Sequence, residues 1–209
     1  MANRFGRWLR TLKGGGAGSS PDDLAHRLEQ LEAEISDTDV GFRGIPLNRA
    51  GDLCMRADDK ERALGYFGRA IDAYLEDEQP EAARAVAQKL IRLHPRAIRT
   101  LCTVTWLDLA AGHLGDALLH LGEYVEAARR GDRRELCRDQ ILEMARIMDD
   151  GPFRRTAAEG LKDLGFPQEA DRVRRWADPD SEDAPEGAES SRELRSLCFQ
   201  AAVGSNRDA

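Results

Sequence analysis

Apolar residues recur every three to four positions along most of this chain, which is the spacing of one face of a helix. Between 51 and 77 the chain reads GDLCMRADDKERALGYFGRAIDAYLED, and the small residues Ala63 and Ala70 fall in step with Phe67. Short segments rich in Gly, Pro and Asp separate the periodic stretches. The pattern predicts helices at 20–36, 46–57, 60–76, 80–93, 97–111, 115–130, 133–148, 153–164 and 167–176.

The expected fold class is all-α, because β-branched runs are absent and the helix formers Ala, Leu, Arg and Glu dominate. The expected loops are two to four residues long, so neighbouring helices should run antiparallel. A helical hairpin cannot bury its apolar face alone and must stack on the next one. We therefore expect an array of hairpins, in which the small residues are spacers where helices cross.

A 34-residue frame that begins at Gly44 tests this expectation. It places Gly51 at position 8, Ala63 at position 20, Phe67 at position 24 and Ala70 at position 27. This pattern resembles the tetratricopeptide repeat, which has small residues at positions 8, 20 and 27 and an aromatic residue near 24. The resemblance implies an α-solenoid whose groove binds a peptide or protein partner.

A second frame fits as well. Started at Leu64 or Ile98, it places Ala83 or Ala117 at position 20, and it differs from the first frame by about one helix. The phase of the repeats therefore stays open. The resemblance is best over 44–130, and the helices from 132 to 176 are expected to extend or cap the stack.

The resemblance also implies which residues line the groove. Groove residues of this family commonly come from positions 2, 5, 9 and 12 of a repeat. The two frames place Asn48, Asp52, Asp72, Arg99 and Trp106 at such positions. Trp106 has two interpretations, an exposed anchor for a partner or a core residue.

The N-terminal arm, MANRFGRWLRTLK, has the pattern of a basic amphipathic helix and is followed by a Gly-rich linker that ends at 19. Three interpretations stay open: a weak contact with an anionic membrane surface, a segment recognised by a partner, or a frayed terminus. The apolar and basic residues of the arm are Arg4, Phe5, Arg7, Trp8, Leu9, Arg10, Leu12 and Lys13.

The sequence leaves open what two further helical segments pack against, and an acidic segment lies before the second of them. In 20–36 the apolar positions are spaced 4, 3, 4, so this helix packs either on the body or on a second copy, and the oligomeric state stays open. Residues 178–190 are acidic and broken by proline, and we expect them to be disordered. A short closing helix is expected at 190–203, with Leu194 and Cys198 on its apolar face. It either docks on the array or stays free.

Composition narrows the function classes. The net charge of −7 argues against a nucleic-acid binder, and four isolated cysteines suggest reduced, buried thiols in the cytosol. The chain lacks the recognisable catalytic, phosphate-binding and metal-binding motifs, so we expect no catalytic residue, cofactor or metal.

The expected organisation is a basic arm and linker at 1–19, a helix at 20–36, a repeat domain at 44–177 and an acidic tail at 178–209. The expected function is a non-enzymatic scaffold or adaptor that binds a partner protein. A peripheral membrane recruiter and a helical enzyme or ligand-binding regulator are the alternatives.

Overall fold

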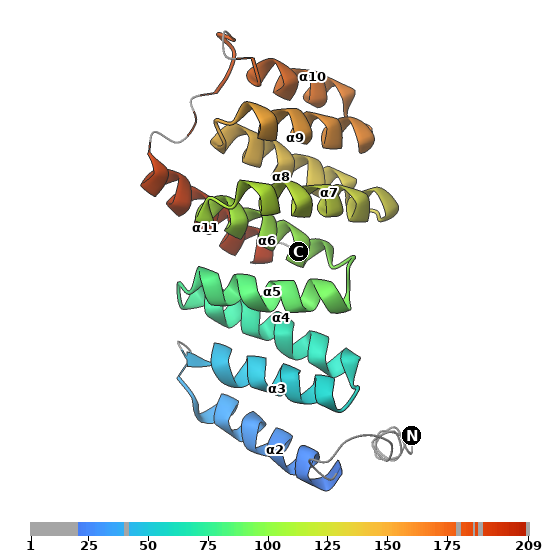
Figure 1. The fold of residues 1–209 in the computed structure, drawn as a ribbon, viewed down its shortest axis with the longest axis vertical. Coiled ribbons are helices and arrows are strands. Elements are labelled where there is room, and N and C mark those ends of the chain that lie inside the picture. The colour runs from blue at the N-terminus through green and yellow to red at the C-terminus, as the bar shows by residue number, and fades with distance from the viewer. Residues whose placement is uncertain (1–20, 40–41, 179–180, 186, 188–189, 208–209) are drawn as a thin grey trace. The chain divides into compact units, whose positions relative to one another are not determined.

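The computed structural model describes residues 21–39, 42–178, 181–185, 187 and 190–207, and all regular structure among them is helical. The all-α class is therefore confirmed. The nine internal helices begin and end within two residues of their expected bounds, while the last helix runs four residues further than expected. The helices are α2 (Pro21–Asp37), α3 (Gly44–Arg56), α4 (Lys60–Glu76), α5 (Pro80–Leu93), α6 (Ile98–Ala111), α7 (Leu114–Arg130), α8 (Arg134–Ile147), α9 (Gly151–Asp163), α10 (Pro167–Trp176) and α11 (Ser191–Arg207) (Figure 1).

The chain divides into two compact units, Met1–Leu93 and His94–Ala209. The helical domain expected at 44–177 thus spans a boundary between units. Within the described residues, each helix is too short or too polar to cross a bilayer.

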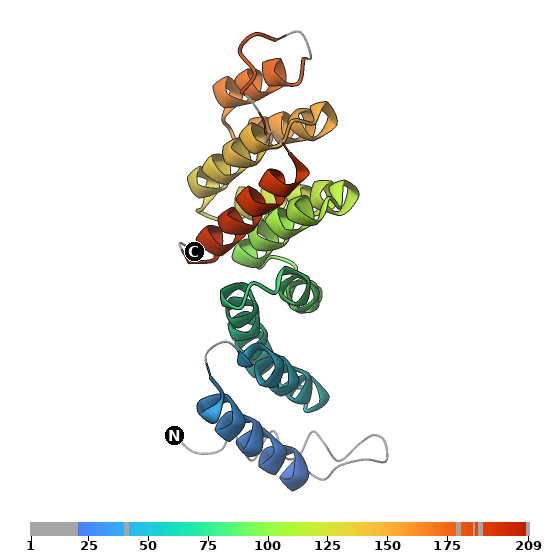
Figure 2. The ribbon, with the colours of Figure 1, turned by 90° about the vertical axis from the view of Figure 1, so that its left-hand side faces the viewer.

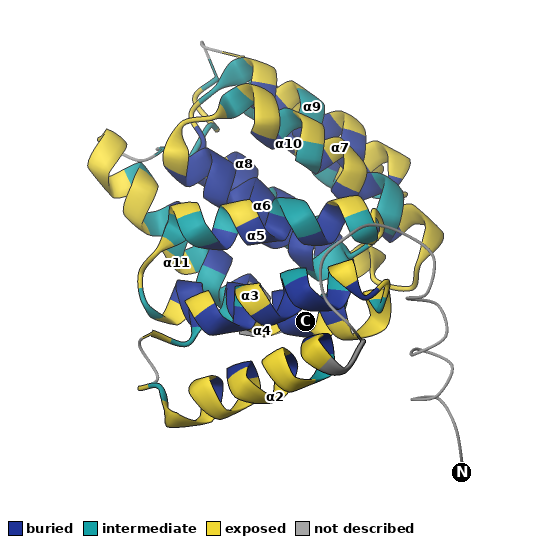
Figure 3. Cartoon of the chain, turned by 60° about the horizontal axis from the view of Figure 1, so that its bottom comes forward, coloured by how far each residue is buried: buried dark blue, intermediate teal, exposed yellow. Residues whose placement is uncertain are grey.

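In the first unit, α3 packs against both α2 and α4, and α4 packs against α5. The apolar seam of α2 is buried inside this unit, as Figure 3 shows by the dark inner face and exposed outer face of that helix. Of the two interpretations of 20–36, the structure therefore supports packing on the body. The seam residues are Leu24, Leu28, Leu31 and Ile35, each 6–7% exposed.

Small residues lie where α3 and α4 cross. A Cβ atom added to Gly51 would lie 2.5 Å from Cε1 of Phe67. Ala63 and Ala70 are completely buried, and the Phe67 ring is 1% exposed. Because protein interiors are close-packed, this arrangement depends on the missing side chain at Gly51. The prediction that a small residue acts as a spacer beside Phe67 is confirmed at Gly51, and Ala63 and Ala70 are buried as that prediction requires.

Four of the turns between helices close in the same way. In each, a residue with positive φ follows the helix, at Asp58, Glu78, Gly112 and Gly165. The next backbone N–H then donates to the carbonyl five residues earlier, as from Gln79 to Tyr74, at 2.8 Å. This bond satisfies a carbonyl at the end of the helix and lets the next helix start at once.

In the second unit, α6 packs with α7 and α9 packs with α10, while α8 contacts α7 and α9. The last helix, α11, lies beside α6 and α8, far from both in sequence (Figure 2). Every residue of α6 from Thr100 to Ala110 is buried. A helix that is apolar on all sides must be covered on all sides, and α11 supplies part of that cover.

Candidate functional site

The contact between α11 and the rest of its unit is the candidate site. The face of α11 that points inward carries small residues, because Cys198 and Ala202 are completely buried and Ser205 is 8% exposed. They fall at i, i+4 and i+7, which is one stripe of a helix. Leu194 and Leu197 flank this stripe and are half-buried.

We call the residues that face this stripe the α11 cradle. A cavity of about 10 Å³ remains where the helices meet, which is room for at most one water molecule. The fit between α11 and the other helices is therefore close. We define the cradle by the lining residues of α6 and α8, which are Ile98, Arg99, Cys102, Leu136 and Gln140.

Gln140 joins the two helices of the cradle. Its Oε1 atom accepts a hydrogen bond from Nε1 of Trp106 at 2.9 Å and one from the thiol of Cys102 at 3.6 Å. The spacing between α6 and α8 is thereby set by polar contacts under α11.

These contacts correct one expectation. The Trp106 side chain has no exposed surface, so it cannot serve as an exposed anchor for a partner. The indole fills the core and its N–H is satisfied by Gln140. Of the predicted groove residues in this unit, only Arg99 lies in the cradle itself.

The two thiols at the site are buried and have raised pKa values. Burial raises the pKa of Cys102 to about 11 and the pKa of Cys198 to about 12. Both therefore remain protonated at neutral pH, and a thiol reacts only as its thiolate. All four cysteines are free and buried, as expected.

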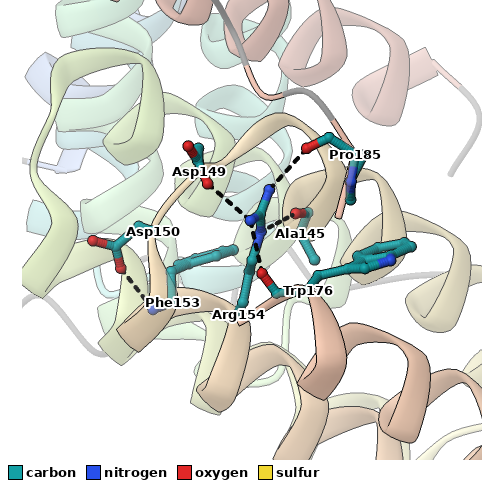
Figure 4. Close-up of polar contacts among 7 residues, drawn as sticks. All are labelled: Ala145, Asp149, Asp150, Phe153, Arg154, Trp176 and Pro185. Carbon is teal, nitrogen blue, oxygen red and sulfur yellow. Dashed lines mark hydrogen bonds and ion pairs between the residues drawn. The ribbon is translucent and has the colours of Figure 1, made fainter. Parts of the chain in front are cut away.

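A buried arginine holds the segment that leads to α11. The Arg154 side chain is 3% exposed and makes four polar contacts, at the centre of Figure 4. It donates to the carbonyls of Ala145 (3.1 Å), Trp176 (2.9 Å) and Pro185 (3.4 Å) and to the Asp149 carboxylate (2.8 Å). Ala145 and Trp176 lie at or near the C-termini of α8 and α10, where a positive charge is favoured.

The Pro185 contact bears on the acidic segment. The described residues of 178–190 form no helix, but they are not free of the body. Pro185 is bound by Arg154, and a Cβ atom at Gly187 would lie 2.7 Å from Cβ of Asp149. The described part of this segment thus contacts the body at Pro185 and Gly187, and the closing helix docks on α6 and α8.

In the first unit, two predicted groove residues accept hydrogen bonds from the same lysine side chain. Nζ of Lys89 on α5 donates to Oδ1 of Asn48 at 3.0 Å and to both carboxylate oxygens of Asp52 at 2.8 and 2.9 Å. The same ammonium lies 5.4 Å from the centre of the Phe67 ring. The structure thus brings Asn48 and Asp52 together on the side of α3 that faces α5. Asp72, the third groove residue predicted in this unit, is half-buried on α4.

One group of described residues could hold a cation. Asp108, His113 and Asp116 place one ligand atom each within 4.8 Å of one another. Asp108 is fully buried and already pairs with Nδ1 of His120 at 2.6 Å. The other two residues are exposed on the surface. We assign no metal to this group.

The predicted N-terminal arm, with Phe5, Trp8 and the basic residues around them, lies outside the described residues. Both the membrane interpretation and the partner interpretation of that arm stay predictions.

Sequence reasoning missed Arg154 and Gln140. A signal for Arg154 was present, since Ala158 and Leu161 follow it at i+4 and i+7 and are buried. A charged residue on an apolar stripe is buried only when it is paired. Gln140 carries no comparable signal, because its partners lie on another helix.

Comparisons with models of protein families, with curated proteins and with solved structures found no match to this chain. The resemblance to tetratricopeptide repeats therefore rests on the residue pattern and on the packed helical pairs alone.

Proposed function

We propose that this chain is a non-enzymatic interaction module that binds a helical segment of a partner protein. One observation carries the proposal. The second unit buries an amphipathic helix from a distant part of its own chain across two other helices. A surface that accepts one such helix has the shape and chemistry to accept another with the same pattern.

The chemistry of the cradle supports binding rather than catalysis. The thiol of Cys102 in the cradle and that of Cys198 on α11 are buried and have raised pKa values, and the amide of Gln140 is engaged in holding α6 and α8 together. Catalytic sites need a group poised to exchange a proton or attack a substrate near neutral pH. The cradle instead offers apolar surface with a polar edge at Arg99, as an interface does.

The test uses the full chain with α11 kept from docking. Ala202→Glu places a carboxylate where no side-chain surface is exposed, so α11 should leave the cradle. A fluorescent peptide of residues 190–207 is then titrated in reducing buffer and followed by anisotropy. Ser196→Glu on the exposed side of α11 is the matched control chain.

We expect the peptide to bind the Ala202→Glu chain saturably, at least about tenfold more tightly than a peptide that itself carries Ala202→Glu. The Ser196→Glu chain should bind the peptide weakly, because its own α11 still fills the cradle. Equal affinity of the Ala202→Glu chain for the two peptides would contradict the proposal.

A further inference from the structure

We infer that α11 is an exchangeable occupant of the α11 cradle, which leaves it when a partner helix of the same pattern arrives. The inference rests on the proposed function and adds the class of partner and the means of control. The partner is an amphipathic helix with small residues at i, i+4 and i+7 and leucines beside them, as in α11.

α11 covers part of α6, but it supplies little of the side-chain bulk in the core of the second unit. Among the described residues, the largest side chains that are fully buried in this unit come from α6 to α9 and none from α11. The side chains that α11 buries completely are small, because they are those of Cys198 and Ala202. Its larger apolar side chains, Leu194, Leu197, Phe199 and Val203, are only half-buried.

The connection to α11 also allows release. Arg154 holds the connecting segment by one bond, to the Pro185 carbonyl, and at 3.4 Å it is the longest of its four contacts. The remaining contacts, to Ala145, Asp149 and Trp176, satisfy the guanidinium when Pro185 departs. Release therefore leaves no buried charge without a partner.

Release exposes a surface that favours a second occupant. Ile98, Cys102 and Leu136 would lose their cover, and an exposed apolar patch of this kind is a binding surface. While α11 is tethered beside the cradle, its effective concentration is high. A partner helix must therefore compete with the tethered α11, so the tether sets the lowest affinity at which a partner can displace it.

The chain carries its own probes for this exchange. Cys198 lies on α11 and Cys102 lies in the cradle, and docking of α11 buries both. Cys137 is completely buried on α8 and reports unfolding of the second unit, while Cys54 is buried in the first unit. Modification by a maleimide, located by mass spectrometry, follows all four thiols in one experiment.

The experiment compares three samples of the full chain: the parent, Ala202→Glu, and the parent with an excess of the 190–207 peptide carrying Cys198→Ala. We expect Cys102 and Cys198 to react at least about tenfold faster in Ala202→Glu, which corresponds to a shift of about 1.4 kcal/mol in the opening equilibrium. In the parent with peptide, Cys198 should react faster. Cys137 and Cys54 should keep the parent rate throughout.

Faster modification of Cys137 together with Cys198 in Ala202→Glu would overturn the inference, because α11 would then be an integral part of the fold. Unchanged rates at Cys198 in both altered samples would overturn it too. Selective exposure of Cys102 and Cys198 in a chain that fails to bind the peptide would support release but contradict the proposed function. The two failures are thus distinguishable.

Discussion

Gly51 lies directly against the ring of Phe67, with room for a hydrogen atom and no more. The contact joins α3 to α4, and it explains why a small residue stands at that point of the apolar pattern. Gly65, on α4, is a helical glycine without such a close neighbour, since a Cβ atom there would meet nothing within 4 Å.

The two glycines should respond oppositely to alanine. Gly51→Ala forces the Phe67 ring or the helix to shift, and we expect it to lower the free energy of unfolding by about 1–3 kcal/mol. Gly65→Ala restricts the unfolded chain without a clash, and should raise it by about 0.5–1 kcal/mol. Urea unfolding followed by circular dichroism measures both. If Gly51→Ala matched the stability of the parent, the close packing of this crossing would be refuted.

The turn after α4 offers a second test. Glu78 has a φ of 54°, a left-handed conformation that disfavours a residue with a Cβ atom. Glu78→Gly should therefore raise the free energy of unfolding by about 1 kcal/mol. Glu81→Gly, in the first turn of α5, is the control and should lower it by about 0.5–1 kcal/mol. A loss of stability in Glu78→Gly, measured by thermal unfolding, would contradict the turn described here.

Substitution of Arg154 should destabilise the protein far more than the same substitution of its neighbour Arg155. Arg154→Met leaves three backbone carbonyls without their donor, and we expect the free energy of unfolding to fall by about 2–4 kcal/mol. Arg155 is exposed, so Arg155→Met should change it by less than about 0.5 kcal/mol. Equal midpoints in urea for the two variants would show that the four contacts of Arg154 contribute little.

The raised thiol pKa values predict a pH dependence. The pKa of Cys198 is about 12 when α11 is docked, against an ordinary value of 9.0, so the docked state holds the proton more tightly. Its stabilising effect is complete below pH 9 and is lost as the pH rises toward 12. Between these values each such thiol lowers the stability of the docked state by up to about 1.4 kcal/mol per pH unit.

Cys198→Ala should therefore flatten the loss of stability between pH 8 and 10.5 relative to the parent. Unfolding midpoints in urea at each pH give the two slopes. Parallel slopes would mean that Cys198 is not buried as described.

The helices were predictable because their signals are local. The 3.6-residue periodicity acts within a few positions, and so do the residues that end or begin a helix, such as Gly112 after α6 and Pro167 at the start of α10. The spacer role of Gly51 was predictable for a similar reason, since the two helices that it separates, α3 and α4, are adjacent in the chain.

The site was less predictable because its contacts are distant in sequence. The apolar face of α11 was recognised, but nothing in 190–203 says that it docks on α6 rather than elsewhere. The clearest unused signal is α6 itself. From Leu101 to Ala110 it contains Asp108 as its single charged residue, so no side of it could face water. That pattern requires a cover, and it is also why Trp106 is not an exposed anchor.

Hydrogen exchange of the backbone amides in the full, unmodified chain distinguishes an exchangeable α11 from one that is an integral part of the fold. If α11 is an exchangeable occupant, its amides should exchange through a local opening, with a free energy well below that of α6 to α9 in the same unit. Addition of the 190–207 peptide should speed their exchange further while α7 and α9 keep their protection. If α11 exchanged only together with α7 and α9 and the peptide had no effect, α11 would be a fixed part of the unit and not an exchangeable occupant of the cradle.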